Sequence, residues 1–218
     1  MSLKIRQKKC LNETIAYVKE WFQNETSGHD WWHINRVRLL ALSIAETEGG
    51  DLFLIEMAAL LHDLDDWKLN ENSKFFKTRN WLDDLDLTEP EKEKIIEIID
   101  QVSFKGAGVP TVARSLEAKI VQDADRLDAI GAIGIARTFA FGGKKGRLMY
   151  HPEMKPNWHK SFEDYKNAVS PTINHFYEKL LLLKDRLNTD TAKEMAESRH
   201  RYMEDFLDRF FKEWECEI

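Results

Sequence analysis

Hydrophobic residues recur three and four positions apart along most of this chain of 218 residues, which is the spacing of a helix face that packs on a core. The alternation of polar and apolar residues that is typical of strands is scarce. In the first third of the chain the pattern predicts helices around residues 11–22, 34–44 and 55–62. Gly49-Gly50 ends the second of these helices, and Asp51 is a suitable N-cap for the third.

A strong helix start follows at Thr88-Glu89-Pro90-Glu91, where a capping residue precedes carboxylates and a proline in the first turn. The apolar residues after it predict a helix that the glycine-rich segment 106–110 ends. One further helix is predicted from Ala113 to about Ala140, with a bend near Gly131 and Gly134.

The last third of the chain is predicted to contain an irregular stretch over residues 142–160 and then two long helices, over about 161–185 and 190–214. No Gly/Ser-rich linker divides the chain. The pattern therefore predicts an all-α fold, with eight or more helices in a single domain over residues 1–218.

Composition narrows the class of protein. Hydrophobic residues make up 43% and charged residues 32%, which is ordinary for a soluble globular protein. The net charge of -6 disfavours duplex nucleic acid as a partner. No apolar run approaches the roughly 18 residues that a membrane span needs, and no secretory signal is evident. Two cysteines, Cys10 and Cys216, exclude a disulfide framework or a cysteine zinc site. A cytoplasmic location is therefore expected.

Two histidines fall on predicted inward faces. His33 shares a helix face with Val37 and Ile44, and His62 shares one with Ile55 and Ala58. Aspartates accompany them, in the pair His62-Asp63 and at Asp125 on a later helix. Burying these polar groups separately is unfavourable, whereas a divalent cation between them removes that cost.

Three segments of the sequence resemble the H…HD…D signature of the HD-domain metal-dependent phosphohydrolases, in the small bacterial single-domain branch: His33-Ile34-Asn35-Arg36-Val37, Leu60-Leu61-His62-Asp63 and Asp123-Ala124-Asp125-Arg126-Leu127-Asp128. Further likeness lies at residues 28–33, 102–106 and 131–137. The resemblance implies that the metal ligands are His33, His62, Asp63 and Asp125. A buried polar network without a metal is the alternative.

The third motif contains more than one aspartate. Asp123 and Asp125 point about 200° apart on a helix, so that only one of them can face an ion. The family context favours Asp125, with Asp123 as the alternative and Asp128 as a group behind the ligands. His29, which begins a second His-Asp pair, is either a loop or capping residue or a group at the pocket mouth.

A site of two histidines and two aspartates leaves positions for water and a substrate oxygen. The ion, one of Mn, Mg, Fe, Co, Ni or Zn, lowers the pKa of water and neutralises phosphate charge. Asp63 is then a catalytic ligand, and Asp66 is expected to take the proton of the attacking water. Asp65 is the rival for this role, and a solvated helix end is the alternative interpretation of both carboxylates.

A phosphorylated substrate needs cationic partners. The candidates are Arg36, Lys68, Lys105, Arg126 and Arg137. The basic segment 142–160 lacks the P-loop pattern. Trp31 and Trp32, beside His33, are expected either to pack in the core or to stack on a base.

The sequence thus predicts a phosphohydrolase for a small phosphorylated substrate, a nucleotide, with pyrophosphohydrolysis as the first reaction and a nucleotidase as the second. The alternative is a non-catalytic helical module that senses a nucleotide or binds a partner. No histidine lies between Leu64 and Ala124, where dinuclear relatives carry extra histidines, and one metal ion is therefore expected. No signal for an oligomeric state is present.

Overall fold

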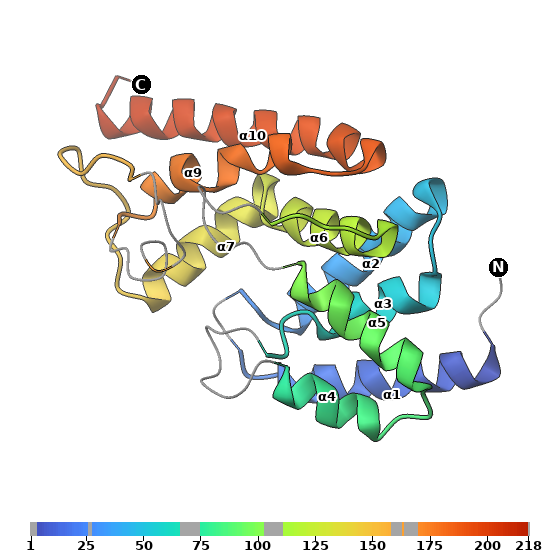
Figure 1. Cartoon of the computed structure of the whole chain (residues 1–218). Helices are drawn as coiled ribbons and strands as arrows, with labels where there is room; N and C mark the ends of the chain where they lie inside the picture. The colour runs from blue at the N-terminus through green and yellow to red at the C-terminus, as the bar shows by residue number, and fades with distance from the viewer. Residues whose placement is uncertain are drawn as a thin grey trace. The chain divides into compact units, whose positions relative to one another are not determined.

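The computed structural model describes residues 4–25, 28–65, 75–102, 111–157, 163 and 170–217 (Figure 1). Across these ranges the chain forms α-helices and short 3₁₀ helices and no strand, which confirms the predicted all-α class. None of the described helices combines the length and the apolar composition needed to cross a membrane. The described chain divides into two compact units, one with the residues up to 102 and 111–125, and one with those from 126 onward.

The first unit carries the helices that hold the candidate site. They are α1 (Ile5–Trp21), α2 (Trp31–Glu48), α3 (Leu52–Leu61), α4 (Phe76–Asp83), α5 (Glu89–Asp100) and most of α6 (Leu116–Asp128).

Helix α3 is the centre of this unit, and it contacts α1, α2 and α5 (Figure 1). Every residue from Phe53 to Leu61 is buried, as expected for a helix that is apolar on all sides. Its start is fixed by Asp51, whose carboxylate accepts hydrogen bonds from the backbone N–H groups of Phe53 and Leu54. The buried Glu56 is paired with Arg38 of α2 at 2.5 Å, so that this charge is compensated.

The predicted helix start at Thr88 is confirmed as the N-cap of α5. Glu91 accepts hydrogen bonds from the backbone N–H and the hydroxyl group of Thr88, both at 2.9 Å. Arg6 of α1 adds a bidentate ion pair to the same carboxylate, at 2.6 and 3.0 Å. The guanidinium of Arg6 is the main reason that the pKa of Glu91 is lowered to about 2, against the opposing effect of burial.

We expect Glu91→Gln to lower the melting temperature at pH 7, with a loss of about 1–2 kcal/mol in the free energy of unfolding. Because the pKa of Glu91 is lower in the folded chain, its stabilising effect is complete above the ordinary carboxyl pKa and is lost as the pH falls toward 2. The difference between wild type and variant should therefore shrink between about pH 4.5 and 2 in thermal melts followed by circular dichroism.

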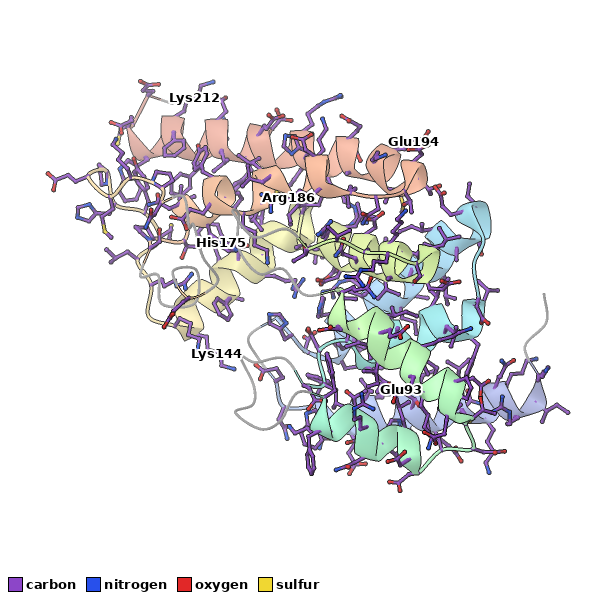
Figure 2. All side chains as sticks on the ribbon, viewed as in Figure 1. Glu93, Lys144, His175, Arg186, Glu194 and Lys212 are labelled. Atoms are coloured by element: carbon purple, nitrogen blue, oxygen red, sulfur yellow. The ribbon has the colours of Figure 1, made fainter. Side chains whose placement is uncertain are left out.

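The matched control for this variant is Glu93→Gln, on the same helix and labelled in Figure 2. Glu93 pairs with Arg79 at 2.8 Å, but both side chains are about half exposed. Exposed pairs contribute little to stability, so the control should melt close to the wild type. An equal effect of the two variants would contradict a special role for the Arg6–Glu91 pair.

The second unit contains α7 (Gly131–Lys144), α9 (Asn174–Glu178), the 3₁₀ helices η1 (Leu180–Leu182) and η2 (Lys184–Arg186), and α10 (Asp190–Trp214). Helices α7 and α10 contact each other through aromatic side chains. Phe139 of α7 meets Phe206 of α10 edge to face, and Phe206 stacks on Phe176 of α9. The helix predicted over 190–214 is confirmed.

Two predicted helices are wrong in their extent. The single helix from Ala113 to about Ala140 is instead two helices, because Gly131 adopts a positive φ of 76° and begins α7 after α6 has ended. The long helix predicted over about 161–185 does not continue through residues 170–185, although Glu163 is helical. Residues 170–185 hold only α9, η1 and η2, and the backbone of Lys179 leaves the helical region between them.

Candidate metal centre

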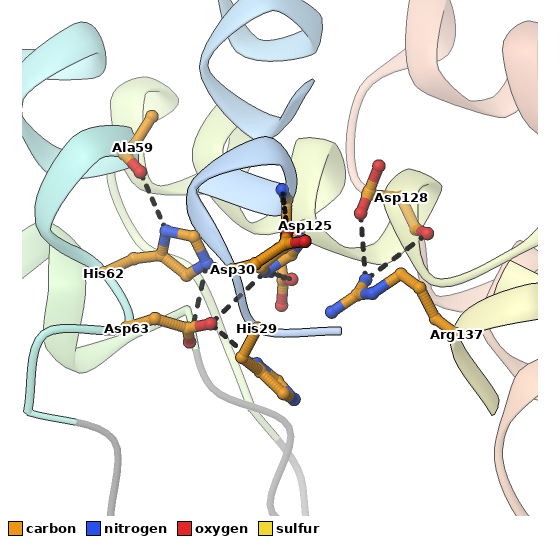
Figure 3. A network of polar contacts seen from close by, with 9 residues as sticks. His29, Asp30, Ala59, His62, Asp63, Asp125, Asp128 and Arg137 are labelled. Atoms are coloured by element: carbon orange, nitrogen blue, oxygen red, sulfur yellow. Dashed lines mark hydrogen bonds and ion pairs between the residues drawn. The ribbon is translucent and has the colours of Figure 1, made fainter. Parts of the chain in front are cut away.

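His33 lies in the first turn of α2, and its side chain is fully buried, as its place on the apolar face predicts. The turn is fixed by Asp30, the N-cap, whose carboxylate accepts a hydrogen bond from the backbone N–H of His33 at 2.9 Å. The capping residue Asp30, which is labelled in Figure 3, therefore fixes the start of the helix that carries His33.

His62 follows the last residue of α3 as its C-cap, and it is buried. Its Nδ1 lies 2.8 Å from the carbonyl oxygen of Ala59 (Figure 3). A carbonyl oxygen only accepts, so Nδ1 carries a proton, and Nε2 is the atom that offers a lone pair to a metal ion when the ring is neutral. This buried Nε2 makes no hydrogen bond within the described part of the chain.

Asp63, in the turn after α3, is buried among three imidazoles. Its Oδ2 lies 2.8 Å from Nδ1 of His29 and 3.3 Å from Nε2 of His33, and its Oδ1 lies 3.5 Å from Nε2 of His62. Burial alone raises the pKa of this carboxyl group, but the facing His62 and His29 outweigh it and lower the pKa well below its usual value. Asp63 is therefore an anion at neutral pH.

Asp125 reaches the same cluster from α6. Its Oδ1 lies 3.7 Å from Nε2 of His33 and 3.9 Å from Nε2 of His62, and the three potential ligand atoms of this group lie within 4.8 Å of one another. Asp123 is fully buried and belongs to neither of the ligand groups found among the described residues. The geometry thus favours Asp125 over Asp123 as the aspartate that faces the histidines.

A divalent cation fits this donor set. The Nε2 atom of His62 faces carboxylate oxygens of Asp63 and Asp125 at 3.5 and 3.9 Å. Ligands bound at about 2.0–2.2 Å around one ion lie about 3.0–3.4 Å apart when adjacent. A small contraction around a central ion would therefore satisfy the buried nitrogen and both charges at once.

His29 is the member of the cluster whose place the sequence left open between a cap and the pocket mouth. The structure puts it beside Asp63, with its ring edge to face against that of His33 at 5.5 Å. Its i,i+4 spacing from His33 is the signal in the sequence that pointed to this proximity. Trp32 beside the cluster is 63% exposed, so the expectation that it packs in the core is wrong.

The carboxylates that rival Asp66 are both engaged elsewhere. Asp65 accepts hydrogen bonds from the backbone N–H groups of Lys77 and Thr78, at 3.1 and 2.8 Å, in the first turn of α4. Asp128, in the second unit, pairs with Arg137 at 2.9 Å. Asp66 itself lies outside the described residues.

The predicted substrate cations are in different situations. Arg36 is half-buried on α2, while Lys68 and Lys105 lie outside the described residues. Arg126 is buried in the second unit and donates to the backbone carbonyl of Arg186, a residue labelled in Figure 2. Together with the Asp128–Arg137 pair, this contact gives Arg126 and Arg137 structural partners.

Comparison with known proteins identifies the family. Residues 31–130 match the sequence model of the HD domain. The YpgQ protein of Bacillus subtilis is 40% identical over 212 residues, with 96% of each chain covered. Its crystal structure in complex with ADP aligns with a TM-score of 0.77 and 37% identity, covering 96% of this chain and 97% of that one.

Two further solved structures agree. An HD-superfamily hydrolase from Bacillus thuringiensis is 48% identical with a TM-score of 0.74, over 96% of this chain and 98% of the other. A protein from Lactobacillus plantarum is 38% identical with a TM-score of 0.87, over 99% of this chain and 100% of the other. Full-length likeness and the histidine–aspartate cluster lead to one conclusion: the chain belongs to the HD superfamily of metal-dependent phosphohydrolases.

Proposed function

We propose that this protein is a nucleotide pyrophosphohydrolase whose ligands His33, His62, Asp63 and Asp125 hold one divalent metal ion. The observation that carries the proposal is the buried Nε2 of His62, which faces two carboxylates and has no hydrogen bond within the described residues. A divalent cation bound between these groups would give this nitrogen a partner.

The nucleotide as substrate is supported by the relative YpgQ, whose crystal structure contains ADP. The two chains align over nearly their full length. A nucleoside triphosphate offers the pyrophosphate leaving group that the proposed reaction requires. Hydrolysis of a nucleoside monophosphate, the nucleotidase reaction, remains the second candidate on the same support.

Each residue of the proposed site has a separate role in the reaction. When bound, the metal ion lowers the pKa of water and neutralises phosphate charge. The Ala59 carbonyl keeps the proton of His62 on Nδ1 and so keeps Nε2 available as a ligand. The carboxylates of Asp63 and Asp125 supply two negative charges toward the ion. Asp66 stays our candidate for taking the proton of the attacking water, because Asp65 and Asp128 are both engaged.

The test is a screen of nucleoside mono-, di- and triphosphates with Mn²⁺, in which the products are separated by chromatography. A pyrophosphohydrolase converts a triphosphate into the monophosphate and pyrophosphate, whereas a nucleotidase releases phosphate and a nucleoside from the monophosphate. Asp63→Ala should lose the activity. The control, Asp83→Ala, removes an exposed carboxylate of α4 and should keep it. Nucleotide binding without turnover would instead indicate the sensing module.

We expect metal analysis of the purified protein to reach about one equivalent per chain. Both groups of potential ligands in the described chain contain His33, and its Nε2 lies near both Asp63 and Asp125. One imidazole nitrogen ligates one ion, so the two groups describe a single centre. Titration of metal-free protein with Mn²⁺ measures the number directly. Two equivalents, with ions about 3.5–4 Å apart in a crystal, would contradict the proposal.

A further inference from the structure

One residue of the cluster, His29, contacts the ligand Asp63 but is not itself one of the four proposed ligands. Nδ1 of His29 lies 2.8 Å from Oδ2 of Asp63, which is closer than the contacts of Asp63 with His33 and His62, at 3.3 and 3.5 Å. The side chain of His29 is 18% exposed and that of Asp63 is 9% exposed, so that the bond is largely shielded from water. A shielded hydrogen bond to an anion is a strong orienting contact.

We infer that His29 is a positioning residue, which holds the Asp63 carboxylate in the orientation that the metal ion requires; this inference rests on the metal centre proposed above. By holding Oδ2, His29 fixes the rotation of the carboxylate and directs Oδ1 toward Nε2 of His62. The terminal torsion of an aspartate is otherwise broad, so a free carboxylate would sample orientations that do not face the ion.

The hydrogen bond constrains the tautomer of His29. An ionised carboxylate only accepts, so at 2.8 Å the Nδ1 atom carries a proton in both the neutral and the charged imidazole. The orienting contact therefore exists in either form of the ring. A nitrogen that carries this proton has no lone pair, so Nδ1 of His29 does not bind a metal ion while it donates to Asp63.

Local backbone structure supports a fixed place for His29. Gly28 before it adopts a positive φ of 87°, a conformation that favours glycine. Asp30 after it is the N-cap of α2. His29 thus lies between a turn and the capped start of α2, the helix that carries the ligand His33.

The test compares His29→Ala with His29→Asn in the full chain. The amide nitrogen of asparagine can donate from nearly the place of Nδ1, whereas alanine cannot donate. After metal removal with a chelator, Mn²⁺ binding is measured by isothermal titration calorimetry. We expect His29→Ala to weaken Mn²⁺ binding by about 10–100-fold, the usual effect of removing a partner of a metal ligand, and His29→Asn to recover most of the loss.

A matched control is His200→Ala, which removes another shielded histidine that faces a carboxylate, Glu204 at 3.4 Å, in the second unit. It should leave Mn²⁺ binding unchanged. Melting temperatures of the metal-free proteins separate a general loss of stability from a loss of affinity, since a positioning role predicts similar values for the two His29 variants.

The outcomes are distinct. Equal losses in His29→Ala and His29→Asn would overturn the inference, because they would make His29 itself a ligand. Wild-type affinity in His29→Ala would overturn it as well, by showing that Asp63 needs no orienting partner. If the wild-type chain binds no Mn²⁺, this result contradicts the proposed metal centre and therefore also the inference about His29.

Discussion

Asp63→Ala is expected to lose both the bound metal and the hydrolytic activity while it keeps the helical fold. Asp63 is the carboxylate that contacts all three imidazoles of the cluster, and the facing histidines keep it ionised against the opposing effect of burial. Removing it takes away one of the two negative charges that face the proposed ion, and the three histidines lose the carboxylate that they share. The fold should persist, because Asp63 follows α3 and the apolar helix itself is unchanged.

The measurements are metal content by mass spectrometry, turnover of the preferred nucleotide and the far-ultraviolet circular dichroism spectrum. Asp83→Ala serves as the control, since this exposed aspartate of α4 pairs only at the surface with Lys92. Turnover at the wild-type level in Asp63→Ala would remove the metal ion from the mechanism. A loss of helical signal would show instead that Asp63 is needed for folding.

The orientation of His33 could be predicted because α2 is amphipathic. Ile34, Val37, Ala41 and Ile44 mark its buried face, and the structure buries them together with His33. The position of His62 follows less directly, since α3 is apolar on every side and periodicity cannot select an inward face. The hydrogen bond from Nδ1 of His62 to the Ala59 carbonyl fixes the direction of the ring, and this bond forms only in the folded chain.

The missed break before α7 is linked to long-range packing. The break before α7 accompanies the close approach of Gly131 to Arg199, where an added Cβ would lie 3.0 Å from the Arg199 side chain. No local pattern reports a contact between residues so far apart in the chain. The contact between His29 and Asp63 is of the same kind, because it depends on the packing of α2 against α3.

The acidic segment after His62 illustrates how structure changes a choice that the sequence leaves open. Asp65 and Asp66 are both candidates for taking a proton, and α3 ends at Leu61, before either of them. Asp65, however, caps the first turn of α4 with both of its oxygens. Both oxygens of Asp65 are therefore already engaged by backbone N–H groups of α4.

Asp66→Asn is therefore expected to keep the metal and to slow turnover by roughly 10²–10⁴-fold, the usual effect of a positioned acid–base group. Asparagine has nearly the same size as aspartate, but its amide cannot take up a proton at neutral pH. The comparison is Asp65→Asn, which removes one acceptor from the α4 cap and should lower the melting temperature more than the turnover. Single-turnover kinetics with metal-loaded protein distinguishes the two variants. Unchanged turnover in Asp66→Asn at equal metal content would assign the proton to Asp65, Asp128 or bulk water.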